Sequence, residues 1–244
     1  MVPKPPLVLL PGLVCDAEVW RQQIALVADI ADCQVVDYGL SDSLEAMAAL
    51  VLSQAPERFA LAGHSMGGRV AMEILRRAPA RVTRIALMDT RTHAKPAGEA
   101  GEIEAAGRYE LLEIARTRGM RAMGERWMPG MIHSDRHSDR ALTTAVLEMI
   151  GRKTPEIFEA QIRALLNRPD AAGELAQVRV PALVLCGRED GWSQLSWHEE
   201  MARVIPGAKL AVVEHCGHMS TMERPVDVAR AMRAWLTEDV KYRQ

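Results

Sequence analysis

The sequence predicts an α/β fold built on a mostly parallel sheet of about six strands, covered by helices on both faces. Short apolar runs of four to six residues recur along the chain, which is typical of strands buried on both faces of a parallel sheet. Between them lie segments with apolar residues every three or four positions, which predict helices. This alternation indicates strand–helix units joined by right-handed crossovers.

The elements follow in chain order. The first expected strand, residues 7–10, ends at Pro11-Gly12, a pair that stops a strand and turns the chain. The remaining strands are expected at residues 33–36, 59–62, 84–88, 182–186 and 209–213. Helices are expected at residues 16–28, 43–54, 66–77, 196–204 and 225–236.

The alternation breaks over residues 92–177, where only helical patterns occur. Three of them cover residues 110–116, 141–150 and 156–166. A single crossover helix needs only about 10–15 residues, so a longer insertion is required. We expect a helical cap at 92–177 on an α/β core formed by residues 1–91 and 178–244.

Composition excludes several classes of protein. The 244 residues carry 30 basic and 32 acidic side chains, a net charge of −2, which offers no electrostatic footprint for nucleic acid or an acidic membrane. No apolar run reaches the ~18–20 residues of a membrane span, and residues 1–6 do not resemble a signal peptide. The four cysteines form no C-x-x-C pair. We therefore expect a cytoplasmic protein with neither nucleic-acid nor membrane partners, and the oligomeric state stays open.

One motif predicts a reactive serine. Gly63-His64-Ser65-Met66-Gly67 follows an expected strand and precedes an expected helix, which is the setting of the nucleophile elbow. So tight a turn strains the serine backbone and needs small residues two positions before and after it. The alternative is a glycine-rich turn in which the serine only caps the helix.

A serine needs a base and an acid to become nucleophilic. His218 follows the last expected strand after Gly217, at the same sheet edge as Ser65, and His215 is its nearest rival. Asp190 follows the preceding strand and is the favoured acid. Glu189 and Asp89 are the alternatives to Asp190. The order Ser65, Asp190, His218 is that of the α/β-hydrolases.

An oxyanion formed during attack on a carbonyl needs backbone N–H donors. The Met66 amide opens the helix after the serine, and the Leu13 amide lies on the loop after the first strand. These two amides are the expected donors. Without Ser65, an ordinary Pro-Gly turn at residues 11–12 would be the better interpretation of that loop.

Several stretches resemble the small bacterial carboxylesterase and enol-lactonase branch of the α/β-hydrolase superfamily. They are residues 9–16, 63–68 and 205–208, the last leading to Gly217-His218-Met219 and Glu223-Arg224-Pro225. The resemblance implies a Ser–His–Asp hydrolase with a helical cap, no metal and no organic cofactor. It assigns the triad and the oxyanion donors to the residues named above. The superfamily's leading hairpin is expected to be absent, and a serine at position 65 argues against the dehalogenase and epoxide hydrolase branches, which use aspartate.

The expected cap is rich in methionine, which fills irregular apolar surfaces. The predicted pocket walls are Leu13, Trp127, Met128, Met131 and Met219; for the cap residues, simple helix core is the alternative. Arg118, Arg121 and Arg126 could meet a substrate carboxylate or lie on a solvated helix surface.

The predicted function is that of a serine hydrolase cleaving a small or medium carboxylic ester through an acyl-enzyme. An enol-lactone, thioester or C–C bond hydrolase would use the same residues. The alternatives of another class are a non-catalytic small-molecule sensor with the same fold and a purely structural domain.

Overall fold

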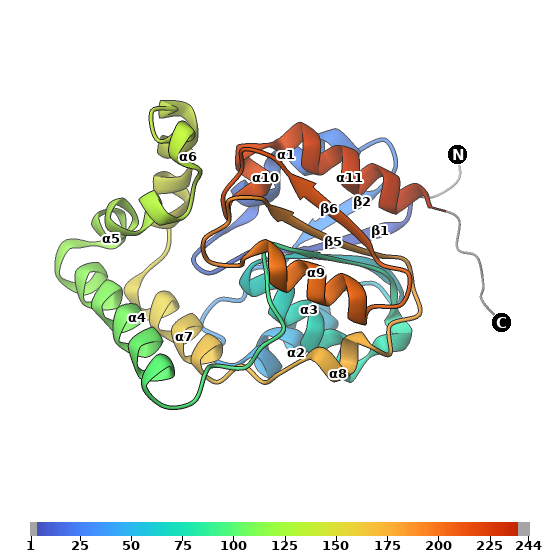
Figure 1. The fold of residues 1–244 in the computed structure, drawn as a ribbon, viewed down its shortest axis with the longest axis horizontal. Helices are drawn as coiled ribbons and strands as arrows, with labels where there is room; N and C mark the ends of the chain where they lie inside the picture. The colour runs from blue at the N-terminus through green and yellow to red at the C-terminus, as the bar shows by residue number, and fades with distance from the viewer. Residues whose placement is uncertain (1–3, 239–244) are drawn as a thin grey trace.

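The computed structural model describes residues 4–238, and these form a six-stranded parallel sheet in the order β2-β1-β3-β4-β5-β6 (Figure 1). The strands are β1 (Pro6–Leu10), β2 (Asp32–Val35), β3 (Phe59–His64), β4 (Val82–Met88), β5 (Ala182–Gly187) and β6 (Lys209–Val213). Helices cover both faces, so the predicted fold class is confirmed. The interior strands β3 and β5 are buried at every residue, whereas β2 and β6 at the sheet edges are partly exposed.

The helices divide between the two faces. The core helices are α1 (Arg21–Val27), α2 (Leu44–Gln54), α3 (Met66–Arg77), α8 (Ala172–Leu175), α9 (Leu195–Val204), α10 (Ser220–Glu223) and α11 (Pro225–Thr237). Helices α1 and α11 pack together on one face, and α2, α3, α8 and α9 cover the other (Figure 1). The expected helix over 16–28 is interrupted, because Asp16 caps a 3-10 turn at Ala17–Trp20 before α1 begins.

Between β4 and β5 the chain is helical, as expected. Helices α4 (Glu99–Arg118), α5 (Met120–Trp127), α6 (Arg140–Gly151) and α7 (Pro155–Leu166) lie beyond the sheet edge to which the strand arrowheads point (Figure 1). Helix α4 is much longer than the expected pattern at 110–116. The pattern covered only part of the helix because most of its residues are partly or fully exposed, and the rest of the helix shows no apolar periodicity. Helix α8 differs from the others in this range, since it packs on the core helices α3 and α9.

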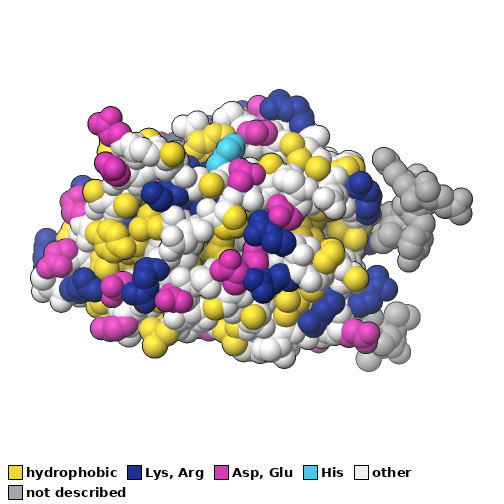
Figure 2. Space-filling view, turned by 90° about the horizontal axis from the view of Figure 1, so that it is seen from below, with side chains coloured by type: hydrophobic (Ala, Val, Ile, Leu, Met, Phe, Trp, Pro, Cys, Tyr) yellow, Lys and Arg dark blue, Asp and Glu magenta, His cyan; other side chains and the backbone are white. Residues whose placement is uncertain are grey.

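Surface charge is mixed in sign. Figure 2 shows basic and acidic side chains interspersed with apolar ones on the face seen from below, with no large field of one sign. This agrees with the net charge of −2. No helix among residues 4–238 is both long and apolar enough to cross a membrane.

Candidate active site

Ser65 lies at a sharp turn between β3 and α3. Its backbone has φ 55° and ψ −116°, a strained region for a residue with a side chain. The two flanking glycines make the turn possible. A Cβ on Gly63 would lie 2.3 Å from the carbonyl oxygen of Gly67, and one on Gly67 would lie 2.1 Å from that of Leu10. The sequence motif therefore has the local geometry expected of a nucleophile elbow.

Three side chains from separate loops form one hydrogen-bonded chain. The Ser65 Oγ lies 2.8 Å from His218 Nε2, and His218 Nδ1 lies 2.8 Å from Asp190 Oδ2. The other oxygen of Asp190 accepts hydrogen bonds from the amides of Trp192 and Ser193 at 2.8 and 2.9 Å. With Asp190 accepting from Nδ1–H, the Nε2 lone pair is directed at the serine hydroxyl.

Burial and charge act in opposite directions on this pair. Burial alone lowers the pKa of His218, but the charge and hydrogen bond of Asp190 outweigh it and raise that pKa above its ordinary value. Burial likewise raises the pKa of Asp190, but the charge of His218 and the amide donors bring it below the usual value. Asp190 is 3% exposed and His218 5%, so little solvent screens the two groups from each other.

The alternative acids, and His64 beside the serine, make other contacts. Asp89 accepts hydrogen bonds from the Gly187 amide at 3.1 Å and from the Ser220 hydroxyl. It does not contact the imidazole nitrogens of His218. His64 donates from Nε2 to the carbonyl oxygen of His218 at 2.8 Å, so it holds the backbone of that loop. Glu189 accepts from the Cys216 amide at 3.0 Å.

The loop after β1 lies against the serine. A Cβ on Gly12 would lie 3.1 Å from His64 Nδ1 and 3.3 Å from the Cβ of Ser65, so glycine lets the loop approach the serine without a tight contact. Within residues 4–238, the backbone amides of Leu13 and Met66 have no hydrogen-bond acceptor, as expected of donors to an oxyanion. The next amide, that of Val14, donates to Gln161 Oε1 of α7 at 2.8 Å and so ties the loop to the helical insertion. Gln161 is a contact that sequence reasoning missed.

A cavity of about 580 Å³ opens above Ser65 and His218. Four of the predicted walls line it: Leu13, Trp127, Met131 and Met219. Met128, contrary to the prediction, does not line the cavity. It begins a 3-10 turn and packs against the hydrophobic core. Trp192, which was not predicted, stacks on Trp127 with ring centroids 4.9 Å apart and lies 5.0 Å from the His218 ring.

Comparison with known proteins identifies the family. A model described as "Alpha/beta hydrolase family" matches residues 7–231. The chain belongs to the α/β hydrolase family. This α/β hydrolase is 32% identical over 202 residues, 76% of each chain, to a pimeloyl-(acyl-carrier protein) methyl ester esterase of Pectobacterium carotovorum. A protein of the same name from Nitrosomonas europaea is 25% identical over 232 residues, 91% of each chain.

Solved structures give the same assignment of fold. A thermophilic esterase from Thermogutta terrifontis superposes with a TM-score of 0.84 at 27% identity, covering 95% of this chain and 89% of that one. The enol-lactonase from Burkholderia xenovorans gives a TM-score of 0.83 at 22% identity over 97% and 92% of the two chains. The chain is therefore a hydrolase of this family by sequence and by fold.

Glu223 holds the histidine loop of this α/β hydrolase. The side chain is 1% exposed. Its Oε1 accepts from the amides of Gly217 and Met219, both at 3.1 Å, and its Oε2 accepts from the amide of His133 at 2.8 Å. Burial raises the pKa of Glu223 even though three amides hydrogen-bond to it. Sequence analysis named Glu223 within a stretch that resembles the family but assigned it no role. Gly217 and Met219 lie within six residues of Glu223, but His133 lies 90 residues away, and a local pattern does not show that the three amides meet one carboxylate.

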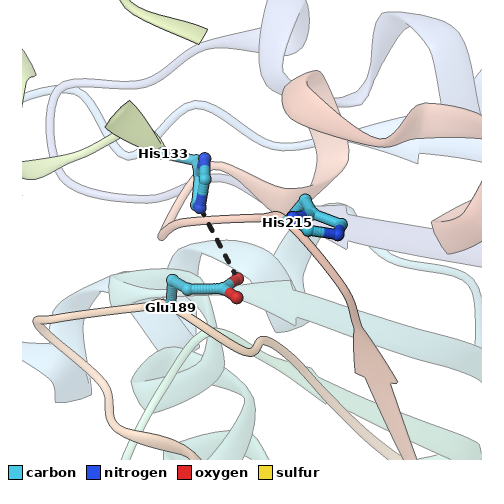
Figure 3. Close-up of side chains that lie close together, drawn as sticks. All are labelled: His133, Glu189 and His215. Atoms are coloured by element: carbon cyan, nitrogen blue, oxygen red, sulfur yellow. Dashed lines mark ion pairs between the residues drawn. The ribbon is translucent and has the colours of Figure 1, made fainter. Parts of the chain in front are cut away.

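A polar cluster lies outside the cavity, where the loops after β5 and β6 meet the helical insertion. His133 Nε2 points at Glu189 across 4.0 Å, with His215 beside them (Figure 3). These three groups could offer metal ligand atoms within 4.8 Å of one another. However, His133 Nδ1 accepts from the Asp135 amide at 3.2 Å, which leaves the proton of the neutral ring on Nε2. In this tautomer His133 presents a donor to Glu189 rather than a metal-binding lone pair.

Proposed function

We propose that this α/β hydrolase cleaves a small or medium carboxylic ester through a covalent acyl-enzyme. The observation that carries the proposal is the continuous chain Ser65–His218–Asp190, with two contacts of 2.8 Å, at the base of a 580 Å³ cavity. The curated relatives named above are ester hydrolases, which supports this reaction class.

The geometry supports a two-step mechanism. Ser65 Oγ attacks the ester carbonyl carbon while His218 Nε2 takes the hydroxyl proton, and Asp190 stabilises the resulting imidazolium. The amides of Leu13 and Met66 donate to the developing oxyanion. The tetrahedral intermediate then expels the alcohol, which receives the proton from His218. A water molecule, deprotonated by His218, then attacks the acyl carbon. The second tetrahedral intermediate collapses, the bond to Ser65 Oγ breaks as His218 returns the proton to that oxygen, and the acid is released.

The substrate class follows from the walls of the cavity near the serine. Leu13, Trp127, Met131, Trp192 and Met219 present apolar and aromatic surface, which suits an acyl chain or an apolar alcohol. The same nucleophile would also attack the carbonyl of a lactone or thioester. The substrate screen therefore includes all three.

The test compares wild type with two serine variants. We expect wild type to hydrolyse p-nitrophenyl esters from acetate to octanoate and to be labelled by a fluorophosphonate. The Ser65→Ala variant should lose the label and at least about 10⁴-fold in kcat. The matched control is Ser53→Ala, on the exposed side of α2, which should retain both. A folded wild type that neither turns over esters, lactones or thioesters nor takes the label would refute the proposal and favour a binding protein.

A further inference from the structure

One arginine in the cavity has terminal nitrogens without a hydrogen-bond partner among residues 4–238. Arg69 lies four residues after Ser65 on α3, lines the cavity and is only 4% exposed. Both terminal nitrogens, Nη1 and Nη2, are buried without a hydrogen-bond partner in the part of the chain that the structure describes. A buried charge without a partner is strongly unfavourable. The arrangement therefore calls for an anion that is not part of the described chain.

The surrounding charges do not supply that anion. Arg91, Arg108 and Arg168 line the same cavity and share one carboxylate, Glu104. Arg168 makes two contacts to Glu104, at 2.7 and 2.8 Å, Arg108 lies 3.0 Å from it and Arg91 3.4 Å. Three guanidinium groups thus contact the two oxygens of Glu104. Neither of these oxygens hydrogen-bonds to Arg69.

The other carboxylates nearby are also engaged. Asp89, the second acid lining the cavity, is held by Gly187 and Ser220. Asp170 attracts Arg69 electrostatically, but it does not line the cavity, and its Oδ1 accepts from the Ala172 amide at 2.9 Å. This end of the cavity therefore carries excess positive charge.

The titration behaviour agrees with this picture. Burial lowers the pKa of Arg69, and the neighbouring cations Arg168 and Arg91 lower it further. An arginine nevertheless keeps its proton at neutral pH. Burial alone raises the pKa of Glu104, but Arg168 and Arg108 outweigh it and hold that pKa at about 2. Glu104 is thus ionised and committed to its partners, and a further anion would stabilise Arg69.

We propose that Arg69 binds a free carboxylate on the substrate, so that the ester cleaved at Ser65 is a half-ester of a dicarboxylic acid or a close analogue. The inference rests on the proposed function and names its substrate class. The planar guanidinium fork matches a carboxylate with two parallel hydrogen bonds. Ser65 and Arg69 line the same cavity, so a substrate with an ester at one end and a carboxylate at the other can contact both groups.

The first test is a selectivity ratio. The mono-p-nitrophenyl ester of adipic acid is compared with p-nitrophenyl hexanoate, which carries a methyl group in place of the second carboxylate. We expect wild type to prefer the anionic ester in kcat/KM. In Arg69→Met the ratio should fall by about 10- to 100-fold, and Arg69→Lys should restore part of it. The control Arg121→Met, on the exposed side of α5 and outside the cavity, should leave the ratio unchanged.

The second test does not depend on turnover. Binding of monomethyl adipate to the Ser65→Ala variant is measured by calorimetry, with methyl hexanoate as the neutral comparison. We expect the half-ester to bind at least tenfold more tightly, and the added Arg69→Met change to abolish the difference. Folding of each variant is checked by circular dichroism.

The outcomes separate the two proposals. Esterase activity with equal kcat/KM for the two p-nitrophenyl esters, and equal binding of the two methyl esters, would overturn the carboxylate site and leave the proposed function intact. A space of about 10 Å³ that also borders Arg69 would then hold a water molecule as its partner. Selective half-ester binding without turnover of any ester would overturn the proposed function and support the carboxylate site.

Discussion

Replacing Glu223 tests whether the histidine loop is positioned by a buried carboxylate. Its Oε1 accepts hydrogen bonds from the amides on either side of His218, and its Oε2 accepts one from the amide of His133. Glu223→Ala leaves three amide donors without this acceptor; those of Gly217 and Met219 are buried and that of His133 is partly buried. Each unsatisfied donor costs about 1–3 kcal/mol, and such effects add incompletely. We expect the free energy of unfolding to fall by about 3–5 kcal/mol.

Glu223→Gln separates the contacts of Oε1 with the His218 loop from the contact of Oε2 with His133. Its amide oxygen can replace Oε1 and keep the amides of Gly217 and Met219. Its NH₂ group then faces the donor of His133, and only that contact is lost. We expect a loss of about 1.5–3 kcal/mol in stability and kcat close to wild type. For Glu223→Ala, in which the His218 loop is released, we expect a fall in kcat of about 100-fold or more.

The assay combines thermal unfolding with ester hydrolysis well below the melting temperature. For a chain of this size, 3–5 kcal/mol corresponds to a Tm lower by about 6–20 °C. Glu125→Gln and Glu125→Ala, at an exposed site on α5, are the matched controls and should change little. An unchanged kcat in folded Glu223→Ala, or an equal loss of kcat in the glutamine and alanine variants, would refute the positioning role.

Two further predictions concern the triad and the elbow. Asp190 raises the pKa of His218, and the base must be unprotonated to act. Asp190→Asn should therefore move the acidic limb of the pH profile of kcat/KM to lower pH and reduce kcat by about 10⁴-fold. An acidic limb at an unchanged pH would contradict this prediction. Gly67→Ala should prevent accumulation of folded protein, since its Cβ would lie 2.1 Å from a backbone carbonyl. Gly151→Ala, where a Cβ meets nothing within 4 Å, should fold normally, as judged by circular dichroism and soluble yield.

Much of the fold was predictable because its signals are local. Buried parallel strands read as continuous apolar runs, and all six expected strands are present with ends shifted by at most two residues. The exposed helix α4 was only partly predicted, because its mostly exposed residues leave no apolar stripe for sequence analysis to detect. The 3-10 turn at Ala17–Trp20 was missed, because apolar residues recur at three- and four-residue steps through both the turn and α1, and the two were predicted as one helix.

The sequence by itself determined the fold class and the position of Ser65, since an apolar strand, a glycine-flanked turn and a helix are contiguous features. It also narrowed the partners of Ser65 to a few loop residues. Only the tertiary structure decided that Asp190 rather than Asp89 contacts the His218 imidazole. The same holds for the hydrogen bonds between Glu223 and the His218 loop, and for the terminal nitrogens of Arg69, which lack a hydrogen-bond partner in the described part of the chain. Those features depend on which side chains from distant segments meet, and on which hydrogen-bond partners a side chain is left without when it is buried.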